Sequence, residues 1–305
     1  MSVLVAGTLS FDSVETPAGR SENEPGGSAL FAAFAAARTA RVRLLTVAGA
    51  DFPEPTLSQL DQLGTDLTGV ERVAGPTFRW RARYFDEGDR RETLASDFGV
   101  LTGWAPRLPD TYRSSPRVFL ANATPDQQVM VLDQLARPAL VALDTMGCWI
   151  EQDRAGLLAL LPRIDALLVN EEEAALLTGL DEAQESARCL RGMGARVAVV
   201  KRGSRGVVAA CPGSVLDLPA YRVPRVMDPT GAGDVFGGAL VAALAPAAGP
   251  PEAAALGEAL AWASALASAV VEDFGLAGLA RLTSGEGLRR RDALRKELRC
   301  LESRD

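Results

Sequence analysis

The stretch over 227–239, MDPTGAGDVFGGA, combines a glycine-flanked loop, a carboxylate and the start of an apolar segment. Gly231 and Gly233 let the backbone turn sharply and approach a ligand closely. The apolar residues that follow recur at helical spacing, so a helix is predicted to begin near Ala232. Free N–H groups in its first turn favour an anion. Asp234 lies in that turn, which suits phosphoryl transfer with this carboxylate as the general base.

A simpler interpretation is that Asp234 only stabilises the start of the helix. The full run over 228–234, DPTGAGD, is more specific. It resembles the C-terminal signature of the ribokinase (PfkB-type) carbohydrate kinase family. The resemblance implies that Asp234 is the catalytic base and that the Gly231-Ala232-Gly233 amides hold the migrating phosphate. It also implies a monovalent-cation site, such as one for K⁺, to which Asp228 and Thr230 contribute.

Landmarks near the N-terminus follow the order of the same family. A short apolar strand is predicted over 2–7, and Asp12 then stands where the family binds substrate hydroxyls. Gly26 and Gly27 precede an alanine-rich helix predicted over 32–38. Taken alone, the glycine pair is typical of a loop before a helix, whereas the resemblance implies that its backbone lies against the substrate.

Phe31 departs from the family pattern, because many sugar kinases have Asn at this position. A phenyl ring cannot hydrogen-bond a substrate hydroxyl. Phe31 is therefore expected to line the substrate site in another way, by stacking on a base or by facing a less hydroxylated ligand. The acceptor stays open between a sugar, a sugar acid, an inositol and a nucleoside.

Two further segments are assigned to the nucleotide by resemblance. Asn170-x-x-Glu173 resembles the motif that organises magnesium and the nucleotide phosphates, and a Mg²⁺ ion held mostly through water needs few protein oxygens. The alternative is that the three glutamates over 171–173 favour a helix start.

A strand, a glycine turn and a second strand are predicted over 197–210. Lys201, Gly203 and Gly206 are expected to lie near the ATP phosphates, with Lys201 acting as a point charge. A solvated strand end is the other interpretation of Lys201. The segment over 270–275 stands where family members close the adenine pocket.

Apolar strands alternate with helical patterns in the second half of the chain. Strands are expected over 139–143, 166–169 and 196–200, and helices over 150–161, 171–177 and 182–193. This order predicts a mostly parallel sheet covered by helices. Asp144, Asn170 and Asn122 each follow a strand, so they should share one rim, where Asn122 is expected to grip the substrate. With the resemblance, the prediction is one domain over 1–305 with a three-layer α-β-α ribokinase-like fold.

One section breaks this rhythm. Residues 77–85 alternate with a period of two, and 92–96 resembles a return strand; with 11–17 they would form a small separate sheet. The resemblance implies a β lid, over about 11–20 and 76–98, that excludes water and often serves as a dimer surface. Arg79, Arg81 and Arg83 share one face. An exposed polar face is the favoured interpretation, with Arg79 as the expected substrate contact.

Composition excludes several classes of function. The net charge of −7 argues against binding nucleic acid backbones. The absence of histidine rules out Ser-His-Asp triads and histidine-ligated zinc. Four scattered cysteines suit a reducing cytoplasm, and no signal peptide is apparent. The apolar stretch over 253–271 is interpreted as a buried helix, so no membrane partner is expected, and the basic run over 289–291 as a solvated face.

The leading hypothesis is therefore a kinase that uses ATP and Mg²⁺ to phosphorylate an alcohol group of a small sugar or related polyol. One alternative is a nucleoside kinase of the same fold. A second is a catalytically silent protein that binds a nucleotide and a metabolite. An oxidoreductase fits less well, because Phe236 stands where the dinucleotide fingerprint needs its third glycine.

Overall fold

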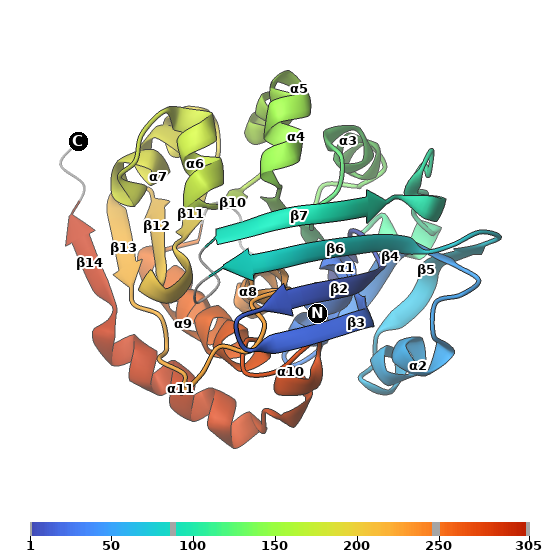
Figure 1. Ribbon diagram of the computed structural model, residues 1–305. Coiled ribbons are helices and arrows are strands. Elements are labelled where there is room, and N and C mark those ends of the chain that lie inside the picture. Colours follow the sequence, from blue (N-terminus) through green and yellow to red (C-terminus); the bar gives the residue numbers. More distant parts are fainter. Residues whose placement is uncertain (1, 86–89, 246–250, 303–305) are drawn as a thin grey trace.

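Two β-sheets organise the chain (Figure 1). The computed structural model describes residues 2–85, 90–245 and 251–302. The larger sheet has ten strands, in the order β14 (Arg299–Glu302), β13 (Ser214–Leu218), β12 (Val207–Cys211), β11 (Val197–Lys201), β10 (Ala166–Asn170), β9 (Leu140–Asp144), β8 (Arg117–Leu120), β1 (Ser2–Ala6), β4 (Arg41–Gly49) and β5 (Asp66–Val73). Every neighbouring pair from β11 to β5 is parallel, and the pairs from β11 to β14 are antiparallel. The predicted, mostly parallel central sheet is confirmed.

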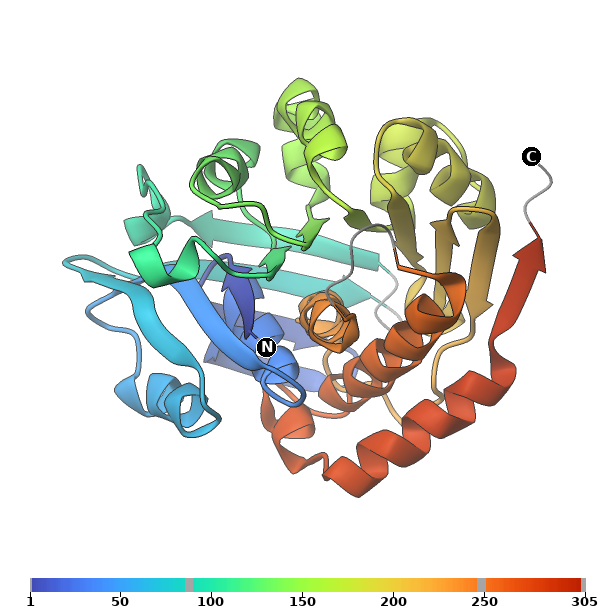
Figure 2. The ribbon, with the colours of Figure 1, turned by 180° about the vertical axis from the view of Figure 1, so that it is seen from behind.

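Helices cover both faces of this sheet. One face carries α1 (Ser28–Ala36), α2 (Glu54–Gln62), α8 (Ala232–Ala243), α9 (Ala253–Val270), α10 (Ala277–Arg281) and α11 (Ser284–Glu297), of which α8, α9 and α11 are seen side by side in Figure 2. The other face carries α3 (Pro125–Asp133), α4 (Gly147–Gln152), α5 (Arg154–Leu160), α6 (Glu171–Thr178) and α7 (Ala183–Gly192). Short 3₁₀ turns are η1 (Gly99–Leu101), η2 (Asp110–Tyr112), η3 (Leu161–Arg163) and η4 (Gly203–Arg205).

Strand alternation explains why there are three layers. On β1, Val3 and Val5 join the hydrophobic cluster of the α8 face, whereas Leu4 and Ala6 join the cluster of the α6 face. Successive side chains of a strand point to opposite faces, so a strand that is apolar throughout must be covered on both sides. The sequence of β1 therefore requires helices on both faces of the sheet.

The smaller sheet, which we call the lid, has the strand order β3 (Gly19–Gly26), β2 (Ser10–Thr16), β6 (Phe78–Phe85) and β7 (Arg90–Asp97). β2 and β6 pair in parallel, and the outer pairs are antiparallel. The prediction of a separate small sheet is confirmed, but it ended the first lid segment near residue 20, whereas β3 continues to Gly26. Within the predicted range 76–98, residues 86–89 lie outside the described part of the chain.

Other boundaries also differ from the predictions. The helix expected over 32–38 begins at Ser28, directly after Gly27 with its φ of 100°. The helix expected over 150–161 is two helices, because Asp153 leaves the helical conformation and its side chain accepts a hydrogen bond from Gly156 N at 2.9 Å.

The C-terminal segment contains a further correction. Arg290, in the run over 289–291 that was interpreted as solvated, is 8% exposed and bonds Glu272 at 2.8 Å. Helix α9 is long and apolar enough to cross a membrane by length and composition, but 61% of it is buried inside the fold. This burial agrees with its interpretation as a core helix.

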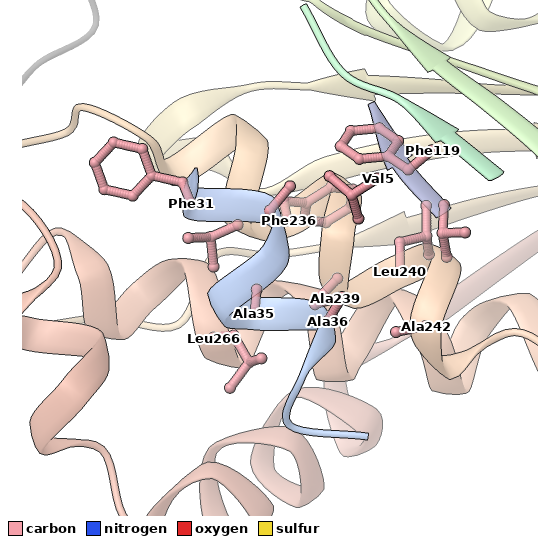
Figure 3. Close-up of a cluster of buried hydrophobic side chains, with 14 of the residues drawn as sticks. Val5, Phe31, Ala35, Ala36, Phe119, Phe236, Ala239, Leu240, Ala242 and Leu266 are labelled. Atoms are coloured by element: carbon pink, nitrogen blue, oxygen red, sulfur yellow. The ribbon is translucent and has the colours of Figure 1, made fainter. Parts of the chain in front are cut away.

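Helices α1 and α8 pack very closely (Figure 3). Ala35 and Ala36 from α1 lie beside Ala239 from α8, in a buried cluster that also contains Phe31 and Phe236. Small side chains allow the two backbones to approach. This contact fixes the start of α8 relative to the rest of the sheet.

Replacing Gly238 with alanine should lower the free energy of unfolding by about 1–3 kcal/mol, as overpacking does in other cores. A Cβ atom on Gly238 would lie 2.2 Å from the carbonyl oxygen of Ala32, so the two helices would have to separate. Gly192→Ala, at the end of α7, is the matched control, because a Cβ there meets nothing within 4 Å. Urea unfolding of both variants checks the expectation, and equal stabilities would contradict it.

Candidate active site

Parallel strands bring four polar side chains to one edge of the large sheet. Asn122 follows β8, while Asp144, Asn170 and Lys201 end β9, β10 and β11, which are consecutive neighbours in the sheet. The carboxyl ends of parallel strands meet at the same edge, so these residues share the rim that the sequence predicted. Lys201 and Asp144 were not grouped together by sequence reasoning, and they turn out to be bonded.

The start of α8 presents free backbone donors at this rim. Gly231 is the N-cap in a left-handed conformation, with φ 76°, and no side chain caps the helix. Ala232 N donates to Pro229 O at 3.2 Å. Within the described chain, the N–H groups of Gly233 and Asp234 have no hydrogen-bond partner. The helix begins where it was predicted to, and the amide of Ala232 is bonded whereas those of Gly233 and Asp234 are free in the described chain.

Lys201 is held at this loop by a buried ion pair. Its Nζ lies 2.6 Å from Asp144 Oδ2, and the two side chains are 18% and 4% exposed. A Cβ atom on Gly233 would lie 3.2 Å from the same Nζ, so the ammonium stands directly beside the free amides. Burial alone would lower the pKa of Lys201, but the carboxylates of Asp144 and Glu173 raise it above its ordinary value. The lysine is therefore a charged member of the site and not a solvated strand end.

Asp234 sits among these charges. Burial raises its pKa from 3.8 to about 7, with the negative charge of Asp144 acting in the same direction and Lys201 opposing it. The side chain is only partly exposed. A general base works best when its pKa lies near the working pH, so this environment suits a proton acceptor at neutrality.

Asn170 and Glu173 form the start of α6, as the alternative interpretation expected. Glu173 N donates to Asn170 Oδ1, and Asn170 N donates to Glu173 Oε2, each at 2.8 Å, which closes a capping box at the start of α6. Glu173 is 5% exposed. Burial raises the pKa of Glu173 to about 7. The positive charge of Lys201 opposes this rise, and the negative charge of Asp144 adds to it. The cap thus holds a buried carboxylate beside the cluster.

No set of three or more His, Cys, Asp or Glu residues in the described ranges is arranged to hold a metal ion by itself. Magnesium at this rim would take most of its ligands from water and phosphate, a coordination it commonly adopts. The sparse carboxylate set around Glu173 fits that coordination.

The glycine turn after β11 lies beside Lys201. Gly203 and Gly206 have φ values of 54° and 91°. A Cβ atom on Gly206 would lie 2.1 Å from the carbonyl oxygen of Leu218. The turn therefore needs glycine to reverse the chain at the rim and to pack on the next strand.

Asp12 faces the glycine pair across the base of the lid. It is 6% exposed and accepts a hydrogen bond from Ser10 Oγ at 2.7 Å. A Cβ atom on Gly26 would lie 2.0 Å from Asp12 Oδ2, and Gly27 has a φ of 100°. Burial raises the pKa of Asp12 to about 7, although the Ser10 hydrogen bond lowers it. The glycine pair makes room for this carboxylate.

Phe31 lies against the loop, and Asn122 contacts α4. Phe31 is 2% exposed, and a Cβ on Gly231 would lie 2.5 Å from its ring, so the ring supports the loop from the core side. Asn122 Oδ1 accepts a hydrogen bond from Trp149 Nε1 at 2.8 Å. This contact aligns the amide with an indole that sequence reasoning did not select.

Arg79 lies on the lid face that carries Arg81 and Arg83. Its guanidinium pairs with Asp51 at 2.9 Å and donates to Asn23 at 2.8 Å. Arg83 pairs with Glu15 at 2.7 Å on the same face. These ion pairs agree with the favoured interpretation, in which the three arginines form an exposed polar face.

Asp228 is buried just before the loop, at 2% exposure. Its Oδ1 accepts a hydrogen bond from Thr230 N at 2.9 Å, and Thr230 Oγ1 donates to the Tyr84 hydroxyl at 3.3 Å. Burial raises the pKa of Asp228. In the described ranges no Lys or Arg forms an ion pair with it, so its carboxylate is a suitable partner for a small cation. Gly275 N, from the segment over 270–275, reaches its Oδ2 at 3.5 Å.

An aromatic row runs from the lid to α4. Phe78 and Phe98 stack with ring centroids 5.4 Å apart, and Phe98 lies 6.5 Å from Trp149. Phe78 belongs to the lid, Trp149 to α4, and Phe98 immediately precedes η1. We call these three residues the aromatic row. It joins the lid to Asn122 through the Trp149 hydrogen bond.

The sequence profile described as pfkB family carbohydrate kinase matches residues 113–280, more than half of the chain. The cytidine kinase of Thermococcus kodakarensis is 31% identical over 248 residues, which cover 79% of this chain and 88% of that protein. The chain belongs to the pfkB carbohydrate kinase family. It is a kinase of this family, and the loop over 228–234 lies within the matched residues.

Solved structures show the same fold. The ribokinase of Thermotoga maritima superposes with a TM-score of 0.71 at 21% identity, covering 96% of this chain and 99% of that one. The Burkholderia thailandensis nucleoside kinase in complex with ADP–inosine gives 0.74 at 19% identity, covering 96% and 95%. The predicted ribokinase-like fold is therefore confirmed.

Proposed function

We propose that this pfkB kinase transfers the terminal phosphoryl group of ATP to an alcohol group of a small sugar or related polyol. The observation that carries the proposal is the start of α8, where two free amides, the Lys201 ammonium and the Asp234 carboxylate lie together. Donors for a phosphate beside a base for a hydroxyl are the two requirements of this reaction.

Each group has one role in the transfer. The acceptor hydroxyl gives its proton to Asp234 as its oxygen forms a bond to the terminal phosphorus. The bond from that phosphorus to the bridging oxygen breaks, and ADP leaves with the electron pair. The amides of Gly233 and Asp234, supported by the turn at Gly231 and Ala232, stabilise the charge on the migrating group. Lys201 supplies a positive charge from the sheet side.

Bound cations would complete the nucleotide site. Mg²⁺ would supply charge neutralisation for the ATP phosphates, and Glu173 and Asn170 would receive its water ligands. Gly203 and Gly206 would shape the phosphate side of the pocket. Asp228 and Thr230 would serve K⁺, which the buried carboxylate without an ion-pair partner supports.

The acceptor would be gripped by Asp12, the backbone of Gly26 and Gly27, and Asn122. Phe31 would act on it through the loop that it supports. A nucleoside is the second candidate, because the aromatic row offers flat faces on which a base could stack. The similarity to a cytidine kinase supports the same candidate.

The oligomeric state and the cellular compartment are proposed from an exposed edge strand and from the cysteines. β7 is an edge strand of the lid with all eight residues exposed, and such a strand can pair with a second copy, so a homodimer through the lid is proposed. The cysteines of the described chain are free, which suits the cytoplasm.

A coupled ADP-release assay over sugars, sugar acids, inositols and nucleosides tests the proposal. We expect acceptor-dependent ADP release with at least one compound, and mass spectrometry should show that compound gaining one phosphate. A nucleoside preference should disappear in Phe98→Ala, while a sugar preference should survive it. ATP binding without any acceptor-dependent release would instead favour a silent binding protein.

A further inference from the structure

One arginine of the lid faces the site from the side opposite the large sheet. In the lid register Arg91 of β7 stands opposite Tyr84 of β6. Its guanidinium lies close to the Tyr84 hydroxyl and 5.5 Å from the centre of the Trp80 ring. Tyr84 is 7% exposed, and its hydroxyl also accepts from Thr230, the residue just before Gly231. The chain of contacts therefore ends at the start of α8.

The charge of Arg91 acts on the site residues themselves. Burial raises the pKa of Asp234, and Arg91 is among the positive charges that oppose this rise. Burial also raises the pKa of Glu173, and the charge of Arg91 again opposes the rise. Asp234 and Glu173 stand on different helices, α8 and α6, and the charge of this one lid residue acts on both.

Arg91 forms no ion pair in the residues that the structure describes, because no carboxylate lies within 4.0 Å of its guanidinium. Lys201, by contrast, is already paired with Asp144. The Tyr84 hydroxyl and the Trp80 face hold the side chain in position without neutralising it. An exposed and unpaired guanidinium near the start of α8 is suited to a tetrahedral anion.

We propose that Arg91 is a catalytic residue that contacts the terminal phosphate of ATP from the lid. This inference rests on the proposed function and adds a third source of positive character to the amides and Lys201. Charge on the transferring group spreads over its equatorial oxygens, and Arg91 reaches them from the side that the helix start and Lys201 leave open. Because it stands on the lid, its contribution depends on the lid covering the site.

Calorimetric binding of MgATP and MgADP to the full chain tests this role without turnover. Arg91→Ala should weaken ATP binding about tenfold and change ADP binding less than about twofold, because only ATP carries the phosphate that Arg91 contacts. With an acceptor, kcat should fall about 10²–10³-fold. Arg90→Ala is the matched control, since Arg90 lies over the Phe85 ring at 4.6 Å and should alter neither affinity.

Two further variants separate catalysis from folding. Tyr84→Phe removes the hydroxyl that orients Arg91 but keeps the guanidinium, so ATP affinity should fall less than in Arg91→Ala. Arg91→Lys should recover part of the ATP affinity. Equal losses for ATP and ADP, or no loss, would overturn the assignment of Arg91. If the wild-type chain binds ATP but phosphorylates no acceptor, the proposed function fails, and the ATP-to-ADP difference still decides the position of Arg91.

Discussion

Asp234→Asn is expected to lower turnover by about 10²–10⁴-fold while ATP still binds nearly normally. The amide keeps the size of the side chain and the free N–H groups of the α8 start, but it cannot take the proton of the acceptor hydroxyl. Steady-state kinetics together with calorimetric ATP binding would measure both effects. Wild-type-like turnover in this variant would remove Asp234 from the mechanism.

The same residue sets the expected pH dependence. In the wild-type enzyme kcat/KM should rise with pH and level off above about 7, because the base must lose its proton and its pKa is raised to about 7. The charges of Asp144, Lys201, Asp12 and Arg91 all act on Asp234, so the observed midpoint belongs to the cluster as a whole. A profile that is flat from pH 5.5 to 8.5 would contradict the assignment.

Lys201→Met should destabilise the fold by about 3–5 kcal/mol, because it leaves the carboxylate of Asp144 buried without its partner. Burial already raises the pKa of Asp144, and loss of the ammonium raises it further. The loss of stability should therefore be larger at pH 8 than at pH 6. At pH 8 the folded protein must either keep Asp144 charged without a partner or keep it protonated at a cost in free energy. Urea unfolding at the two pH values measures it.

Two comparisons make this measurement specific. The double variant Asp144→Asn/Lys201→Met should recover much of the stability, since no lone charge stays buried. Arg83→Met breaks an exposed pair with Glu15, at 46% and 47% side-chain exposure, and should cost no more than about 1 kcal/mol. If Lys201→Met costs as little as Arg83→Met, the ion pair is not formed in solution.

Features governed by short-range chemistry were predictable from the sequence. The helix start at Ala232, its glycine N-cap and the rim residues after β8, β9 and β10 follow from local patterns of glycine, polar and apolar residues. The parallel sheet follows from strands that are apolar throughout, because such strands must be covered on both faces.

Features that depend on distant partners were not predictable. The Lys201–Asp144 pair joins two strands separated by β10, which no local spacing encodes. Arg91 was missed because β7, with the sequence RRETLASD, has no apolar face to indicate which side turns inward. β3 was missed for the same reason, since its residues over 19–26 are mostly polar and glycine.

The acids whose pKa stands near neutrality all gather at one place. Asp12, Glu173 and Asp234 each reach about 7, and the chain contains no histidine. A ligand that brings negative charge beside such acids raises their pKa further, so nucleotide binding at neutral pH draws protons from solution. The heat of binding then includes the ionisation heat of the buffer, and comparing buffers would count the protons that the site takes up.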